Sequence, residues 1–181
     1  ENTLQNQDLA IKVHISLEDC YNGSVVETRY ELLSGKFQTV ELNIPKGITS
    51  NEIIQYAGLG DDSIPLIPRG NLLVTIIVNN SEDFIRRGDD LCTTLSISAF
   101  EAMIGTSKTI TGLDGEEYLL NITPGVQPNH EIIYSNCGFY NYKKNKYGNF
   151  IVIIVIDIPT IHDSIIRDIL MNLHTSYYNN I

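Results

Sequence analysis

The residues of this chain that could take part in catalysis do not form a catalytic set. His162, Asp163 and Ser164 are the residue types of a hydrolytic triad, but they stand side by side in the sequence. Adjacent residues at the start of a helix cannot converge on one another as a triad requires. Asp163 or Ser164 is better interpreted as a helix cap. We therefore predict that the protein is not an enzyme.

The residues that could bind metals are equally scattered. The four histidines form neither an HxxxH nor an HExxH pattern. Three cysteines, Cys20, Cys92 and Cys137, form no CxxC pair. The pairs Asp61-Asp62 and Asp89-Asp90 lack the alternating oxygen ligands of a calcium loop, so they are interpreted as solvated turns. We expect no metal or other cofactor. The odd number of cysteines indicates a reducing compartment, which favours the cytoplasm and leaves a secretory-pathway or exported location open.

The charge of the chain limits the partners that it can bind. A net charge of −10 repels phosphate backbones, which disfavours nucleic acid as a partner. The one basic run, Lys143 to Lys146, is interpreted as a solvated loop, with a contact to an acidic partner as the alternative. No segment is long enough to span a bilayer. Residues 1–7 are polar, and we expect them to be disordered.

The elements that position these residues come from an internal duplication. The phrase NIPKGI begins at Asn43 and NITPGV at Asn121, and 121 − 43 = 78. Gly70 recurs as Gly148 with the same offset of 148 − 70 = 78. Upstream, Gly23 corresponds to Gly105, with an offset of 105 − 23 = 82. We infer a tandem duplication of a unit of about eighty residues.

Each copy is predicted to consist mainly of strands. Alternation of apolar and polar residues, or a continuous apolar run, predicts strands at 10–15, 25–33, 39–44, 72–78 and 150–158. Residues 17–21 and 99–103 are predicted to form single helical turns, each followed by a glycine. The expected fold is mainly β, with two tandem homologous small β-sandwich domains at 8–80 and 81–159, built as antiparallel sandwiches or open barrels.

A different pattern begins after Pro159. Apolar residues recur at helical spacing from residue 160 to residue 178, which predicts a C-terminal amphipathic helix within 160–181. The first copy has no equivalent of this helix. Its apolar stripe must pack either against its own domain or against another subunit.

Six motifs in the order of the chain resemble one family. These are LEDCYNG, NIPKGI, AGLGD, GNLLVTIIV, FIRRGDDL and LDGEEYLLNITPG. Together they resemble the C-terminal substrate-binding region of the DnaJ-type J-domain co-chaperones, the forty-kilodalton heat-shock family. The resemblance covers about Asp8 to Tyr178. It implies two homologous β domains in tandem, in agreement with the duplication.

The resemblance also implies a function. Members of this family bind unfolded polypeptides in an apolar groove of the first β domain and deliver them to the seventy-kilodalton heat-shock chaperone. The groove positions match Ile11, Val13, Thr28, Tyr30 and Val74, although the residues alone favour a core role for each of these. The terminal helix of the family makes a homodimer, which implies an interface through Ile165, Ile166, Ile169, Leu170 and Leu173.

Some positions depart from the family pattern. The chain lacks the four CxxCxGxG repeats of zinc-bearing members, which implies the zinc-free class. Thr28 stands where related members often carry a large aromatic residue, so the pocket is expected either to be shallower or to be filled by Tyr30. Members of the zinc-free class bind the acidic tail of the partner chaperone through basic residues of the first β domain. Arg29 matches one of these positions, and Lys12 and Lys46 are nearby candidates. No His-Pro-Asp tripeptide is present, so the J domain is expected upstream in a longer parent protein. The alternative function is a dimeric β scaffold that docks a folded partner.

Overall fold

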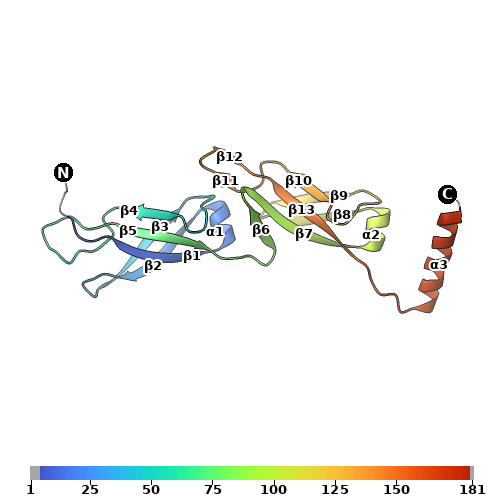
Figure 1. The fold of residues 1–181 in the computed structure, drawn as a ribbon, viewed down its shortest axis with the longest axis horizontal. Coiled ribbons are helices and arrows are strands. Elements are labelled where there is room, and N and C mark those ends of the chain that lie inside the picture. The colour runs from blue at the N-terminus through green and yellow to red at the C-terminus, as the bar shows by residue number, and fades with distance from the viewer. Residues whose placement is uncertain (1–4, 180–181) are drawn as a thin grey trace.

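The computed structural model describes residues 5–179 as an elongated molecule in which two β units precede a terminal helix (Figure 1). The first unit contains β1 (Leu9–Ile15), α1 (Leu17–Asn22), β2 (Ser24–Glu31), β3 (Phe37–Ile44), β4 (Ile53–Tyr56) and β5 (Leu72–Val78). The second contains β6 (Phe84–Arg87), β7 (Asp90–Ser98), α2 (Ala99–Ile104), β8 (Thr106–Thr111), β9 (Glu117–Ile122), β10 (Glu131–Tyr134), β11 (Tyr140–Asn141), β12 (Lys146–Tyr147) and β13 (Phe150–Asp157). Helix α3 (Ser164–Asn179) follows. The predicted fold class is confirmed.

The two units share one core topology, to which β6 adds a fourth strand beside β7 in the second unit. In the first, β5 lies between β1 and β4, and β2 pairs with β3 in a separate hairpin; in the second, β13 lies between β7 and β10, and β8 pairs with β9. The strand register is also the same, because Leu9 pairs with Leu72 and its equivalent Leu91 pairs with Phe150. The expectation of purely antiparallel sheets was wrong: β1 and β5 run parallel, as do β7 and β13. A long connection containing a hairpin and a further strand makes this pairing feasible.

Both short helices begin with the same cap. Ser16 Oγ accepts a hydrogen bond from the Asp19 amide at 3.0 Å, and Ser98 Oγ accepts one from the Glu101 amide at 3.2 Å. In each case the acidic side chain bonds back to the serine amide, which completes a capping box. A glycine with positive φ then ends each helix, as the sequence predicts.

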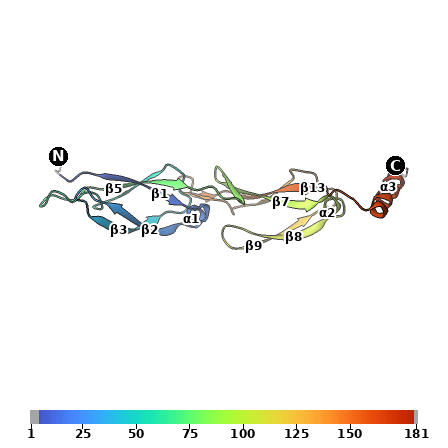
Figure 2. The same ribbon diagram turned by 90° about the horizontal axis from the view of Figure 1, so that it is seen from below.

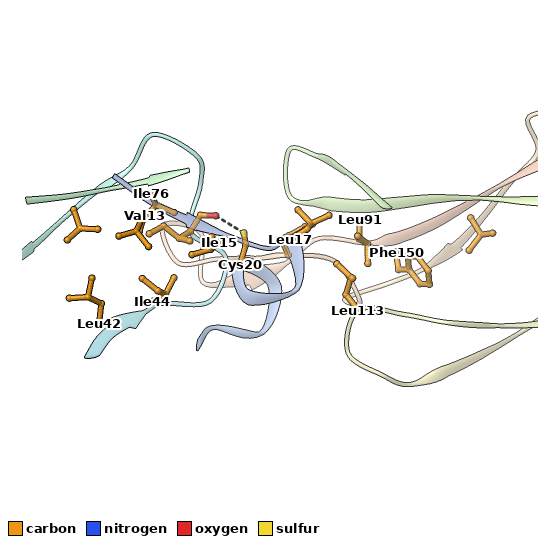
Figure 3. Packing of buried hydrophobic residues seen from close by; sticks show 14 of the residues in the cluster. Val13, Ile15, Leu17, Cys20, Leu42, Ile44, Ile76, Leu91, Leu113 and Phe150 are labelled. Atoms are coloured by element: carbon orange, nitrogen blue, oxygen red, sulfur yellow. Dashed lines mark hydrogen bonds between the residues drawn. The ribbon is translucent and has the colours of Figure 1, made fainter. Parts of the chain in front are cut away.

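The core of the first unit lies between its three-stranded sheet and the β2–β3 hairpin. Figure 2 shows these as two layers, and the second unit repeats the arrangement. Val13 and Ile76 face Leu42 and Ile44 across the space between the layers (Figure 3), and all four side chains are buried. Burying each such side chain stabilises the fold by about 1.5–3 kcal/mol. In the second unit, Phe150 has this central place, with aromatic rings packed around it.

The N-terminal lead is more ordered than the sequence suggests. Residues 1–4 of the expected disordered segment lie outside the described residues. Asn6 is only 3% exposed, and its side chain accepts a hydrogen bond from the Ile64 amide at 2.9 Å. The Asn6 amide also donates to the carbonyl of Pro68 at 2.9 Å. The expectation of disorder was therefore wrong at Asn6, because its amide groups bond the loop before β5.

Helix α3 stands away from the two β units (Figure 1). Asp163 caps it by accepting a hydrogen bond from the Ile166 amide at 3.0 Å. No residue of its described span, Ser164–Asn179, is buried. Residues 180 and 181, which the sequence assigned to the same segment, lie outside the described residues.

Candidate functional site

The residues predicted to contact a client polypeptide fall into two groups. Val13 and Tyr30 are each 6% exposed, and Val74 is fully buried, so these three belong to the core. Ile11 and Thr28 are half-buried. Ile11 is adjacent to Val74 in the β1–β5 ladder, and the Tyr30 hydroxyl donates to the Leu59 carbonyl at 2.6 Å. Their role in client binding stays a prediction.

Ile11 and Thr28 lie on two open strand edges. Within the described residues, β1 is the outer strand of its three-stranded sheet, and β2 pairs only with β3. The outer backbone groups of such strands are available to an extended chain, which can add as a further strand. Alternate side chains of both strands are half-buried next to these edges: Leu9 and Ile11 on β1, and Val26 and Thr28 on β2. This surface can therefore combine backbone hydrogen bonds with apolar contacts.

The three basic residues predicted to bind an acidic tail do not form one cluster. Arg29 lies over the ring of Phe37, with 4.5 Å between its guanidinium carbon and the ring centroid. Lys12 is exposed on β1, in the other sheet. Lys46 follows the end of β3 and contacts the second unit, where its ammonium donates to the Tyr147 hydroxyl at 2.5 Å. Lys46 is thus separated from Arg29, which pairs with Thr39 near the start of β3.

Sequence reasoning missed the junction between the two units. Arg86, on β6, donates hydrogen bonds to the carbonyls of Ile48 at 2.6 Å and Gly47 at 3.0 Å in the first unit. Its guanidinium carbon lies 4.3 Å from the ring centroid of Phe139 in the second unit. The thiol of Cys20 also donates to the Ile48 carbonyl at 2.9 Å (Figure 3). One side chain therefore joins a turn of the first unit to an aromatic ring of the second.

Further contacts hold the same junction. The Tyr21 hydroxyl donates to the Cys137 carbonyl at 2.9 Å, and the Tyr21 ring meets the edge of Phe139 at 5.3 Å between centroids. Burial raises the pKa of Tyr21 to about 12, so its hydroxyl remains a donor at neutral pH. The Asn22 side chain donates to the Leu113 carbonyl at 3.0 Å. The FIRRGDDL motif was the available signal, but it does not reveal which arginine reaches the first unit.

Two cavities flank the linker between the units. Their volumes are about 400 Å³ and about 380 Å³. Leu17, Phe84 and the linker residues 79–81 line both of them. None of the residues predicted to contact clients lines either cavity. The predicted client-binding residues on β1 and β2 therefore lie outside these cavities.

The predicted dimerisation residues lie on α3. Four are exposed, with Ile165 at 70%, Ile166 at 47%, Ile169 at 53% and Leu173 at 61%, and Leu170 is half-buried. Their spacing puts them along one side of the helix. This apolar stripe has no covering element within the described part of the chain.

Comparison with known proteins identifies the family. The sequence profile described as "DnaJ C terminal domain" matches residues 9–159. The chain belongs to the DnaJ C-terminal domain family. It is similar to Chaperone protein DnaJ 1 of Corynebacterium glutamicum, at 31% identity over 76% of this chain and 36% of that protein. It is also similar to Chaperone protein DnaJ of Borreliella burgdorferi, at 29% identity over 82% of this chain and 42% of the relative. A third relative, Chaperone protein DnaJ of a Synechococcus species, is 33% identical over 67% of this chain and 32% of its own length.

Membership of the DnaJ C-terminal domain family places the chain in a chaperone and co-chaperone family. The chain spans about a third to two-fifths of the length of these relatives. Within residues 5–179, no group of three or more His, Cys, Asp or Glu side chains could hold a metal ion. No helix in that span is long and apolar enough to cross a membrane.

The turn that joins β2 to β3 is short and is closed by a hydrogen bond from the Leu32 amide to the Lys36 carbonyl at 2.8 Å.

Proposed function

We propose that this chain is the polypeptide-binding part of a DnaJ-type co-chaperone. It binds unfolded or non-native segments along the open edges of β1 and β2, and its parent protein delivers them to the seventy-kilodalton heat-shock chaperone in the cytoplasm. The observation that carries this proposal is a pair of open strand edges with half-buried side chains, in a domain of the DnaJ C-terminal family. In this proposal the chain holds non-native segments and carries out no chemical step.

The physical basis is strand addition combined with apolar burial. An extended client forms main-chain hydrogen bonds with an open edge, which selects against compact folded proteins. Its apolar side chains gain about 25 cal/mol per Å² of buried area next to Ile11 and Thr28. Val13, Tyr30 and Val74 support this surface from the core. Because a shallow surface makes few specific contacts, its affinity is modest and its specificity broad.

The exposed stripe of α3 supports a homodimer. An amphipathic helix with no buried residue in its described span leaves apolar area in water, and a second copy of the stripe can cover it. Two linked client surfaces increase the avidity for a client that has two apolar segments. Arg29 and Lys12 remain the candidates for contact with an acidic chaperone tail on the first unit.

The experiment compares two isoleucine variants. Ile11→Glu introduces a charge beside the proposed client surface, whereas Ile133→Glu introduces the same charge on β10, an edge strand of the second unit where Ile133 is 54% exposed. Binding of a labelled Leu/Phe-rich extended peptide is measured by fluorescence anisotropy, after circular dichroism has shown that both variants are folded. We expect Ile11→Glu to weaken binding about tenfold and Ile133→Glu to leave it unchanged.

A dimeric scaffold is the second candidate, because Val13, Tyr30 and Val74 lie in the core. A scaffold prefers one folded partner, whereas a chaperone prefers denatured protein. Equal affinity for native lactalbumin and for its reduced, carboxymethylated form would contradict the client-binding proposal. So would an unchanged affinity of Ile11→Glu for the extended peptide.

A further inference from the structure

The second unit contains a strand that the first unit lacks. β6 folds back on β7 through a turn at Gly88 and Asp89, and it pairs with the side of β7 that faces away from β13 (Figure 1). Gly88 has a φ of +65°, which glycine adopts without strain. The equivalent residue of the first unit is Asn6, since 88 − 82 = 6; its φ is not positive, and its amide bonds the Pro68 carbonyl. Within residues 5–179, the corresponding side of β1 therefore has no strand partner.

The presence of β6 changes the burial of the residues with which it pairs. Leu91 and Cys92 on β7 are only 1% and 2% exposed. Their equivalents on β1 are Leu9 and Ala10, since 91 − 9 = 82 and 92 − 10 = 82. Leu9 is half-buried and Ala10 is exposed. The first unit thus leaves uncovered the part of the edge that β6 covers in the second unit.

The contacts of β6 show what a strand on this edge contributes. β6 runs antiparallel to β7, with Phe84 opposite Thr93. Phe84 and Arg86 are half-buried, and the ring of Phe84 lies 6.2 Å from that of Phe150 between centroids. Ile85, between them, is 67% exposed. The edge therefore contacts alternate side chains of the added strand and leaves the intervening one in water.

The same comparison favours β1 over β2 as the edge that accepts a strand. β8 is the equivalent of β2, and within the described residues it pairs only with β9. The second unit has thus added a strand to the edge equivalent to β1 and none to the edge equivalent to β2. This is a direct example, within the molecule, of strand addition to one of the two edges.

We propose that a client segment binds β1 as β6 binds β7, antiparallel and in the same register. This inference rests on the proposed client-binding function and adds the edge, the direction and the side-chain preference. A large apolar side chain would lie opposite Ile11, since 93 − 82 = 11, and a long side chain two residues further on would lie opposite Leu9. The residue between them would face water. The preferred segment is therefore of the type Phe-x-Arg, with little selection at the middle position.

The probe is the fluorescein-labelled peptide of residues 81–88, which contains β6. Its binding to the whole chain is followed by anisotropy. In the peptide, Phe84→Ala should weaken binding about tenfold, whereas Ile85→Ala should change it by less than about twofold. Equal losses from the two substitutions would overturn the proposed register.

Disulfide crosslinking tests the edge and the direction. The whole chain carries Cys137→Ser, which removes the one cysteine that is not buried, and a single new cysteine by Ala10→Cys or Lys12→Cys on β1. The peptide carries Ile85→Cys or Asp83→Cys. In the proposed register, position 10 lies opposite position 85 and position 12 opposite position 83, because Ile85 pairs with Cys92 and 92 − 82 = 10.

Directly opposite residues on adjacent strands have Cβ atoms about 4.5–5.5 Å apart, which a disulfide can bridge with a small adjustment. We expect these two pairs to crosslink at least about tenfold faster than the two exchanged pairs. Faster crosslinking of the exchanged pairs would show parallel binding and overturn the direction. A Glu27→Cys variant on β2 is the control for the edge. If it crosslinks faster than both β1 variants, the choice of β1 is wrong.

The failure of this inference can be distinguished from the failure of the proposed function. If the peptide of residues 81–88 does not bind while the Leu/Phe-rich peptide binds, the register on β1 is overturned and client binding stands. If neither peptide binds, both proposals are overturned. Binding of both peptides, with the expected crosslinks, supports both.

Discussion

Arg86 allows a quantitative test of the junction between the two units. Replacing it with methionine keeps an unbranched side chain of similar length but removes the donors that reach the Gly47 and Ile48 carbonyls. A hydrogen bond from a charged donor contributes about 1.5–3 kcal/mol. The contact with the Phe139 ring contributes about 0.5–2 kcal/mol. Because these interactions are coupled, we expect Arg86→Met to reduce the free energy of unfolding by about 3 kcal/mol.

The adjacent arginine provides a matched control. Arg87 forms an exposed ion pair with Glu131 at 3.7 Å, and such pairs contribute about 0–1 kcal/mol. Urea unfolding of both variants at one protein concentration gives the two free energies. In Arg86→Met we further expect the transition to broaden or split, because the two units lose one of the links that join them. Equal free energies for Arg86→Met and Arg87→Met would refute the conclusion that Arg86 joins the units.

Three further predictions concern the turn, the helix and pH. Gly47→Ala should lower the free energy of unfolding by more than about 2 kcal/mol, because φ is +80° and the added Cβ meets a main-chain carbonyl. Gly35→Ala, with φ of +79° and open space around it, should lower the free energy of unfolding by only about 1 kcal/mol. Ile169→Asp should convert the proposed dimer to monomers in sedimentation velocity, and a persistent dimer would refute the α3 interface. The hydrogen bond from Lys108 lowers the pKa of Glu101 from 4.5 to about 2. Its stabilising contribution is thus complete above pH 4.5 and is lost as the pH falls towards 2, and Glu101→Gln should remove this pH dependence from the urea midpoint.

The sequence predicts the repeated elements well because their signals are local. Alternation at residues 10–15 and the apolar run at 72–78 are properties of single strands, and the glycines after α1 and α2 mark helix ends. The parallel pairing of β1 with β5 was missed, since alternation does not encode the direction of a partner strand. Interpreting Lys143 to Lys146 as a loop located the turn but not the contact of Lys46 with Tyr140 and Tyr147 on either side of it.

The residues predicted to contact clients show a second limit of prediction from sequence. Ile11 and Val13 lie on the same face of one strand, so periodicity assigns them the same environment. The structure buries Val13 and leaves Ile11 half-buried, because the layers close over the end of β1 near α1. The partners of Arg86 lie 38 and 39 residues away and in the other unit. A contact of this kind depends on how two folded surfaces meet, which no local pattern records.

The parallel pairing of β1 and β5 has a consequence for how the chain is made. Leu9 pairs with Leu72, so a further 72 − 9 = 63 residues must be synthesised after Leu9 before its partner exists. At about 5–20 residues per second, β1 waits about 3–13 s for its partner after leaving the ribosome. The second unit repeats this delay, since Leu91 must wait for Phe150. Each unit therefore exposes an unpaired apolar strand during translation, so the nascent chain is open to aggregation until its own sheets close.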